Sequence, residues 1–125
     1  MAKTICVDFD GVLHHYTSGW KGEEVVADPP TPGAMEWLAG LQQDPRLQVA
    51  IYSSRSKHEA GVFAMRGWLR EHGTPFGVNV DTLLFPTEKP SAFLTIDDRA
   101  ICFKGTFPTI SEIHDFRTWT QRSSG

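Results

Sequence analysis

Short apolar runs alternate with segments of helical periodicity along this chain. Uninterrupted runs over Thr4–Val7, Leu47–Tyr52 and Ala92–Ile96 predict strands that are buried on both faces, as in a parallel sheet. Weaker apolar runs predict one or two strands within Phe76–Phe85 and a short strand over Ile101–Phe103.

Three segments have the spacing of amphipathic helices. The first begins at Pro32, the second covers Lys57–His72 with Gly73 at its C-terminal end, and the third covers Ile110–Thr120. Leu13–Asp28 has no clear period and is expected to form an irregular excursion or a small hairpin. Strands that alternate with helices predict an α/β fold around a central parallel sheet.

Composition adds limits rather than a function. The 125 residues are enough for one domain, which we take to span 1–125. A net charge of −3 disfavours a general polyanion binder but is compatible with a local basic groove. Cys6 and Cys102 lie within apolar runs and are interpreted as small buried side chains in a reducing compartment. Neither a signal-peptide pattern nor a run long enough to span a membrane is present, so a cytoplasmic location is expected.

The most informative polar residues follow the first predicted strand. Asp8 and Asp10 are two positions apart, and an extended chain would direct both side chains into one space, with Gly11 allowing a turn or a close approach to a ligand. At about 4 Å and an effective dielectric near 20, two carboxylates repel by on the order of 4 kcal/mol. A proton on one of them or a cation between them would relieve that repulsion.

A second and a third group of polar residues follow the same pattern. Ser53, Ser54 and Arg55 come directly after the second long strand, where a hydroxyl and free backbone amides suit an anionic oxygen. Lys89 precedes the strand over 92–96. Each has a simpler interpretation, since serine is common in turns and an isolated lysine usually lies on the surface.

The fourth group is the acidic pair Asp97 and Asp98, directly after an apolar strand. Adjacent carboxylates at a strand end suggest a Mg²⁺ site, because Mg²⁺ prefers oxygen ligands. Without a metal, Asp98 would instead pair with Arg99 or cap the following turn. In parallel sheets, ligands bind at the carboxyl ends of the strands, so these four groups are expected to converge there.

In this order, the four groups resemble the motifs of the haloacid dehalogenase superfamily over the whole chain. Asp8-Phe9-Asp10-Gly11-Val12 is similar to the first motif, Ser53 to the second, Lys89 to the third and Asp97-Asp98 to the fourth. The resemblance implies a three-layer α/β/α Rossmann-like fold, a requirement for Mg²⁺ and an aspartyl-phosphate intermediate. Family dehalogenases lack the second aspartate of the first motif, so its presence implies phosphatase or phosphotransferase chemistry. The Ser-Arg and Asp-Asp-Arg contexts are also similar to the phosphatase domains of polynucleotide kinases.

The resemblance also implies roles for the acidic residues. Asp8 would attack phosphorus and form an acyl phosphate, while Asp10 would donate a proton to the leaving oxygen and later accept one from water. Mg²⁺ would contact Asp8, the backbone carbonyl of Asp10 and Asp97, with Asp98 bound through water or orienting the others.

The remaining site residues would bind the phosphoryl group. Ser53 and the Ser54 amide would hold its oxygens, and Lys89 would neutralise its charge. Gly11 and Arg55 are assigned to substrate binding, with Arg55 as a candidate for a basic rim that could also include Arg66 and Arg70. For the last two residues, a solvated helix surface is the simpler interpretation.

The intervals between the motifs leave no room for a folded cap domain, so the site is expected to be open. The only lid would be the excursion over 13–28, whose aromatic residues would either border the substrate or pack beneath the excursion; these residues are His14, His15, Tyr16 and Trp20. An open site suits a bulky phosphorylated substrate, such as a polynucleotide end, a phosphoprotein or a glycan phosphate. A partner subunit could also cover it.

Two other functions fit parts of the pattern. A phospho-accepting receiver domain has a similar length and set of residues, but it carries its acidic pair after the first strand, whereas here the adjacent pair comes last. A catalytically silent phosphate-binding module on the same fold is the second alternative, although no key position is replaced.

Overall fold

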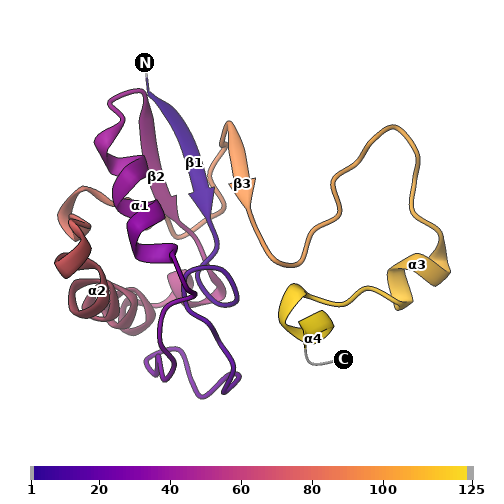
Figure 1. Ribbon diagram of the computed structural model, residues 1–125, viewed down its shortest axis with the longest axis horizontal. Helices are drawn as coiled ribbons and strands as arrows, with labels where there is room; N and C mark the ends of the chain where they lie inside the picture. Colours follow the sequence, from indigo (N-terminus) through magenta and orange to yellow (C-terminus); the bar gives the residue numbers. More distant parts are fainter. Residues whose placement is uncertain (1, 124–125) are drawn as a thin grey trace.

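The computed structural model describes residues 2–123. Its centre is an open three-stranded parallel sheet in the order β2–β1–β3, formed by β1 (Lys3–Val7), β2 (Leu47–Ile51) and β3 (Leu94–Ile96) (Figure 1). The register places Val7 of β1 beside the last residue of each neighbouring strand. The predicted α/β fold with a parallel sheet is confirmed, and all three strands end at the same edge.

A fourth extended segment borders β2, where one or two strands were expected within Phe76–Phe85. Ile51 N–H donates to the Leu84 carbonyl at 2.8 Å, and Leu84 N–H donates to the Val49 carbonyl at 3.0 Å. This parallel pairing is an isolated bridge rather than a strand. The preceding residues form two 3₁₀ turns, η2 (Thr74–Phe76) and η3 (Val80–Thr82). The prediction of a full strand was therefore wrong, because Gly77 at φ +93° and the Asn79 side chain, which accepts from Asp81 N–H, favour turns.

The first two predicted helices are confirmed close to their expected ranges, whereas the third is not continuous. The helical segments are α1 (Ala34–Gln43), the 3₁₀ turn η1 (Ser54–Lys57), α2 (Glu59–Gly73), α3 (Ile110–His114) and α4 (Trp119–Ser123). The single helix expected over 110–120 is divided into α3 and α4. The Thr118 N–H donates to the Gln121 side chain at 2.9 Å, which is half of a capping box and starts a new helix.

The hydrophobic core lies between one face of the sheet and helices α1 and α2. Ile5 and Val7 of β1 and Val49 and Ile51 of β2 enter it, because alternate residues of a strand share a face. From the two helices the core takes Met35, Leu38, Met65, Trp68 and Leu69. Figure 1 shows both helices on the same side of the sheet.

The other face of the sheet carries the intervening residues. Cys6 is buried there, as expected, and its register partners are Ala50 of β2 and Thr95 of β3. Strand β3 is largely exposed, with Leu94 at 51 % of its maximum, so the expectation that β3 is buried on both faces was wrong. The reason is that α1 and α2 cover the core face over β1 and β2, while β3 lies at the free edge of the sheet.

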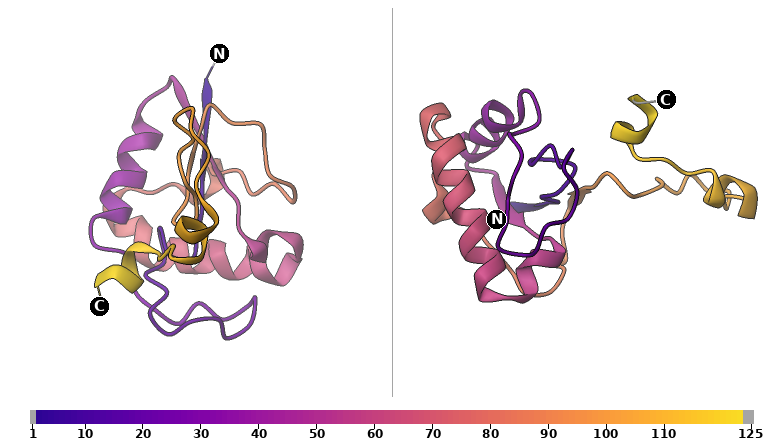
Figure 2. Two further views of the ribbon diagram at one scale, coloured as in Figure 1. Left: turned by 90° about the vertical axis from the view of Figure 1, so that its right-hand side faces the viewer. Right: turned by 90° about the horizontal axis from the view of Figure 1, so that it is seen from below.

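Beyond β3 the chain leaves the sheet as an extended arm, residues 99–118, and returns at α4 (Figures 1 and 2). Ile101–Phe103 forms no strand in this arm, and Cys102 is exposed rather than buried. Both predictions were wrong because the arm projects from the sheet and its apolar residues have no strand to pair with. Cys6 and Cys102 are both free thiols.

The excursion over 13–28 is irregular, as expected, and contains only single bridges that His14 makes with Asp10 and Pro30. Among the described residues, no helix has the length and apolar character needed to cross a membrane.

Two glycines of α2 provide a matched test of the packing beneath η1. A Cβ on Gly61 would collide with the backbone carbonyl of Arg55, whereas a Cβ on Gly67 would meet no atom within 4 Å. Gly61→Ala should lower the free energy of unfolding by about 1–3 kcal/mol through overpacking. Gly67→Ala should raise it by up to about 1 kcal/mol through helix propensity. Urea unfolding of both variants measures the difference, and equal effects would contradict this packing.

Candidate active site

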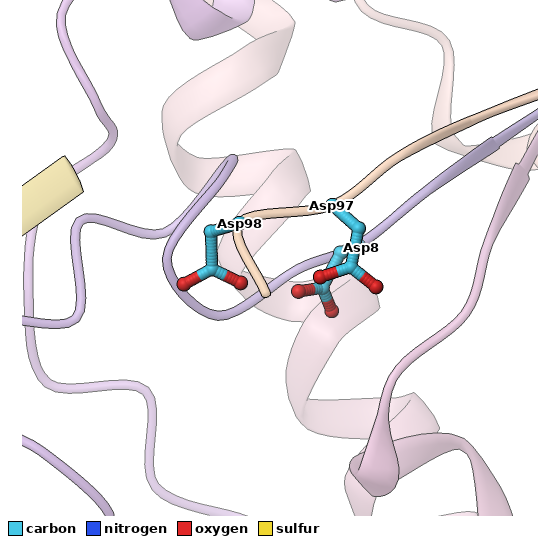
Figure 3. A group of neighbouring side chains, drawn as sticks. All are labelled: Asp8, Asp97 and Asp98. Carbon is cyan, nitrogen blue, oxygen red and sulfur yellow. The ribbon is translucent and has the colours of Figure 1, made fainter. Parts of the chain in front are cut away.

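Three carboxylates meet at the carboxyl edge of the sheet. One oxygen each from Asp8, Asp97 and Asp98 lies within 4.8 Å of the other two (Figure 3). The register explains the convergence. Val7 of β1 and Ile96 of β3 are partners in the sheet, and they directly precede Asp8 and Asp97. Three hard oxygen donors at this spacing could hold a divalent cation such as Mg²⁺.

The protonation of Asp8 reflects this crowding. Burial, the Asp97 charge and a hydrogen bond with Asp98 raise the pKa of Asp8 to about 8. Phe9 N–H donates to Asp8 Oδ1 at 2.8 Å and opposes the rise without cancelling it. At neutral pH, Asp8 therefore holds a proton that a cation in the cluster would displace.

Gly11 makes room for the cluster. It has φ +84°, and any side chain there would collide with the Asp98 carboxylate. The Gly11 carbonyl accepts a hydrogen bond from Trp119 Nε1 at 2.7 Å, which ties α4 to the first motif. The structure thus shows Gly11 as the residue that admits Asp98, and it does not test the expected contact with substrate.

A cavity of about 210 Å³ brings two of the cluster aspartates together with three other residues chosen from the sequence. It is lined by Cys6, Asp8, Tyr52, Ser53, Ser54, Lys89, Thr95 and Asp97. Five of the residues chosen from the sequence therefore border one space, although they come from four separate segments. Larger hollows exist, including one of about 490 Å³ at the amino ends of the strands and one of about 340 Å³ lined by residues that include Ser56, Lys57 and Glu59, but neither is bordered by a cluster aspartate.

Three lining residues were missed by the sequence analysis. Cys6 and Thr95 each precede a cluster aspartate by two positions, so strand alternation would have placed them on the same side as Asp8 and Asp97. Tyr52 directly precedes Ser53 and could have been included by position.

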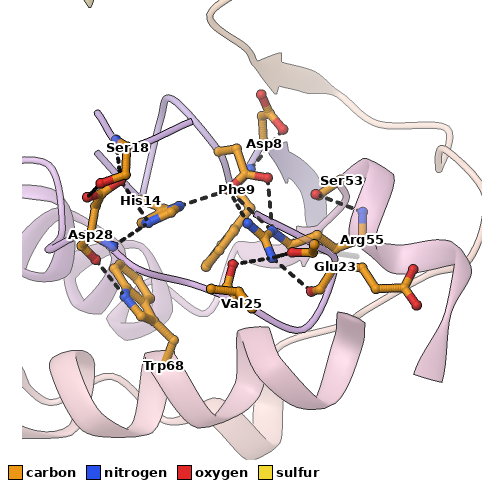
Figure 4. Close-up of polar contacts among 12 residues, drawn as sticks. Asp8, Phe9, His14, Ser18, Glu23, Val25, Asp28, Ser53, Arg55 and Trp68 are labelled. Atoms are coloured by element: carbon orange, nitrogen blue, oxygen red, sulfur yellow. Dashed lines mark hydrogen bonds and ion pairs between the residues drawn. The ribbon is translucent and has the colours of Figure 1, made fainter. Parts of the chain in front are cut away.

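Ser53 also has a local structural role. Its buried hydroxyl accepts from Arg55 N–H at 3.1 Å, and its own N–H donates to Ser56 Oγ at 3.0 Å (Figure 4). This capping box begins η1. Ser53 is thus both a turn residue, as in the simpler interpretation of the serine pair, and a residue that lines the cavity.

Asp10 does not join the acidic cluster. Its carboxylate accepts from Arg55 Nε at 2.9 Å and lies 2.8 Å from His14 Nδ1. The expectation that Asp8 and Asp10 share one space was wrong, because the strand ends at Val7. The next residues form a turn in which His14 N–H donates to the Phe9 carbonyl at 2.9 Å.

Asp10 is held in its ionised form. Burial raises the pKa of Asp10, but hydrogen bonds from His14 and Arg55 and the Arg55 charge lower it below its ordinary value. Asp28 N–H donates to His14 Nε2 at 3.0 Å, so the imidazole proton lies on Nδ1 and is donated to Asp10. The initial proton donation expected of Asp10 would require this network to change.

Arg55 is an internal anchor and not part of a basic rim. Its side chain has no exposed surface, and Nη1 donates to the carbonyls of Gly22, Glu23 and Val25 at 2.8–3.1 Å (Figure 4). The substrate-binding role expected of Arg55 is therefore corrected, because its donors are directed at Asp10 and at the excursion. A cation can be buried here only because Asp10 neutralises it.

The aromatic residues of the excursion have different environments. His14 is 1 % exposed and packs against Trp68, whose Nε1 donates to the Asp28 carbonyl at 3.0 Å, so His14 belongs to the interior. Trp20 is half exposed and lies over the Arg55 guanidinium. His15 contacts the Trp119 ring. Neither Trp119 nor the Asp28–Trp68 contact had a signal in the sequence.

Arg66 and Arg70 have local partners. Arg66 lies over the Phe85 ring, and Arg70 pairs with Asp81 at 3.2 Å. Among the basic residues chosen from the sequence, only Lys89 borders the cavity.

A scan against protein-family models found no match, and a search of curated proteins found no relative. The function is therefore inferred from the residues of the site and their geometry.

The buried ion pair generates a stability prediction. Arg55→Met should lower the free energy of unfolding by about 3–5 kcal/mol, because it leaves Asp10 as an unpaired buried charge. Adding Asp10→Asn should recover part of this loss in urea unfolding. Arg46→Met is the control and should have almost no effect, because the Arg46–Asp44 pair is exposed. A double variant as unstable as Arg55→Met alone would show that the charge is not the cause.

Proposed function

We propose that this protein is a Mg²⁺-dependent phosphatase of the haloacid dehalogenase type, which hydrolyses a phosphomonoester through an aspartyl-phosphate intermediate. The observation that carries the proposal is the convergence of Asp8 and Asp97 with Ser53, Ser54 and Lys89 on one cavity. These groups match the needs of phosphoryl transfer: a nucleophile, carboxylates for a cation, donors for phosphate oxygens and a balancing ammonium group.

The three-layer Rossmann-like arrangement is part of this proposal. Its support is the parallel order Leu84, β2, β1, β3 together with the packing of α1 and α2 on one face. We also place the protein in the cytoplasm, where the free thiols of Cys6 and Cys102 would stay reduced.

Asp8 is the nucleophile in the proposed reaction. One of its oxygens forms a bond to phosphorus as the ester P–O bond breaks and the leaving oxygen takes the bonding electrons, departing as an alkoxide or phenolate that solvent then protonates. Bound Mg²⁺, held by Asp8, Asp97 and Asp98, would lower the pKa of Asp8 and offset charge on the transferring group. Lys89, which lines the same cavity, balances the phosphoryl charge, and the Ser53 hydroxyl and Ser54 amide orient the phosphoryl oxygens.

Asp10 is suited to the second half of the reaction. As a carboxylate, it can accept a proton from the water that hydrolyses the acyl phosphate. To protonate the leaving group in the first half, Asp10 would first have to gain a proton, and its contact with Arg55 would have to loosen. The enzyme should therefore favour phosphoesters whose leaving alcohol is acidic, such as aryl phosphates.

The described residues form no separate cap over the cavity. The excursion over 13–28 is tied to the domain by Arg55, which donates to the carbonyls of Glu23 and Val25, and by Trp68, whose Nε1 donates to the Asp28 carbonyl. The proposed substrate class is the one expected from the sequence, a bulky phosphate such as a polynucleotide end, a phosphoprotein or a glycan phosphate.

A silent phosphate-binding module is the second candidate, and one observation favours it. The ion pair with Arg55 holds Asp10 away from the acidic cluster, as in a site without an acid–base group. Mg²⁺-dependent stabilisation without turnover on a broad panel of phosphate esters would identify such a module. A receiver-like phospho-acceptor would instead accumulate stable phospho-Asp8.

Metal binding should depend on pH. The pKa of Asp8 is about 8 in the fold, against an ordinary value of 3.8, so the metal-free fold keeps a proton that the unfolded chain has lost. The stability of the metal-free protein should therefore fall between about pH 4 and pH 8. Mg²⁺ replaces that proton, so the increase in Tm on adding Mg²⁺ should be larger at the upper end of this range.

Asp8→Asn is the control for this pH dependence. It should raise the Tm of the metal-free protein near pH 8, because a neutral amide no longer repels Asp97. It should also remove most of the Mg²⁺ effect. A Mg²⁺-induced shift that is unchanged by pH or by this substitution would place the metal elsewhere.

Turnover tests the chemical roles. With Mg²⁺ and an aryl phosphate, Asp8→Asn should lower kcat by at least about a thousandfold, since it removes the nucleophile. Lys89→Met should also lower kcat/KM strongly. Lys57→Met is the matched control, because Lys57 is an exposed lysine of η1 that does not line the cavity. Retained hydrolysis in Asp8→Asn would exclude Asp8 as the nucleophile.

A further inference from the structure

The arm over residues 99–118 carries an unusual amount of exposed apolar surface. Phe107 is 81 % exposed and Ile110 is 76 % exposed. Ile101, Phe103 and Ile113 are each more than half exposed. Figures 1 and 2 show the arm projecting from the β3 side of the sheet. Single exposed apolar side chains are ordinary, but a contiguous set in one segment indicates an interaction surface.

Both ends of the arm are attached to their own domain. At its start, Arg99 N–H donates to Asp97 Oδ1 at 2.9 Å, beside the acidic cluster. At its end, Trp119 Nε1 donates to the Gly11 carbonyl at 2.7 Å, and the Trp119 ring contacts His15. The arm is therefore joined to its domain at both ends, and its middle part projects from the sheet (Figure 1).

Strand β3 presents a second apolar surface. Within the described residues it pairs only with β1, so the backbone groups of its outer edge are available. Phe93 and Leu94 are 65 % and 51 % exposed beside that edge. The chain thus carries two apolar surfaces, the arm and the β3 flank, on the same side of the domain.

The total accessible surface area shows how much more surface this chain exposes than a compact protein of the same mass. It is 8,058 Å² for a mass of 14.0 kDa. A compact monomer of this mass would expose about 6,700 Å², so the excess is about 1,400 Å². A standard interface buries about 800 Å² on each partner. The excess is therefore large enough for a stable interface.

We propose that the occupant of this surface is a second copy of the same chain, in a two-fold dimer. The arm of each copy would pack on the β3 flank of the other, so the two apolar surfaces of one chain would cover those of its partner. Charge does not oppose this association, because the arm carries three basic and two acidic side chains, which are Arg99, Lys104, Arg117, Glu112 and Asp115. A hollow of about 340 Å³ within the arm, lined by residues including Ile101, Pro108 and Phe116, offers a groove for a protruding side chain.

Sedimentation equilibrium of the full chain tests the proposal. The wild type should have a mass twice 14.0 kDa at micromolar concentration. Phe107→Asp and Ile110→Asp should each raise the dissociation constant by at least about 30-fold, as expected for apolar anchors near the centre of an interface. Phe63→Asp is the control, because Phe63 is 79 % exposed on α2, away from the arm, and should leave the dimer intact.

Several results would overturn the dimer. These are a monomer at every concentration, a dimer that survives both arm substitutions, and a dimer that Phe63→Asp disrupts equally. Because all three side chains are exposed, the variants should keep the wild-type circular dichroism spectrum, and retained Mg²⁺-induced stabilisation would confirm that the fold is intact. Hydrogen exchange that protects the arm in a monomer would show that the chain's own sheet, and not a second copy, covers it.

Discussion

The buried ion pair between Arg55 and Asp10 is the interaction on which the site depends. Arg55 joins the turn after β1, the start of η1 and the carbonyls of the excursion, so one guanidinium positions three segments. It also separates two aspartates that are two positions apart. Asp10 is neutralised within the protein, whereas Asp8 is left among like charges that only a proton or a cation can balance.

The two faces of the sheet contribute to different parts of the protein, the core and the cavity. One face packs against α1 and α2 and forms the core. The other face carries Cys6 and Thr95, which line the cavity next to the cluster aspartates. The arm leaves the domain at this side, immediately after Asp98, and returns to Gly11 through Trp119. The segment around Asp8 and Gly11 and the segment around Asp97 and Asp98 are therefore linked both through the acidic cluster and through the arm that ends in α4.

Where local pattern and neighbouring structure agreed, the sequence was a reliable guide. The apolar runs at β1, β2 and β3 are strands, and the parallel alignment of β1 with β3 brings Asp8 and Asp97 together as expected. Prediction failed where a segment lacked a partner or where a turn competed. Leu84 makes only a bridge, the arm forms no strand, and Asp10 leaves the strand direction because a turn begins at Phe9, two residues after Val7.

The sequence by itself determined the three strands β1, β2 and β3 and the polar residues that stand at their carboxyl ends. Both properties depend on residues close together in the chain, where apolar runs and the period of a strand are sufficient. Only the tertiary structure decided that Arg55 is buried against Asp10, that His14 is interior and that Trp119 reaches Gly11. Those contacts join residues up to 108 positions apart, and their energies depend on desolvation that no local pattern encodes.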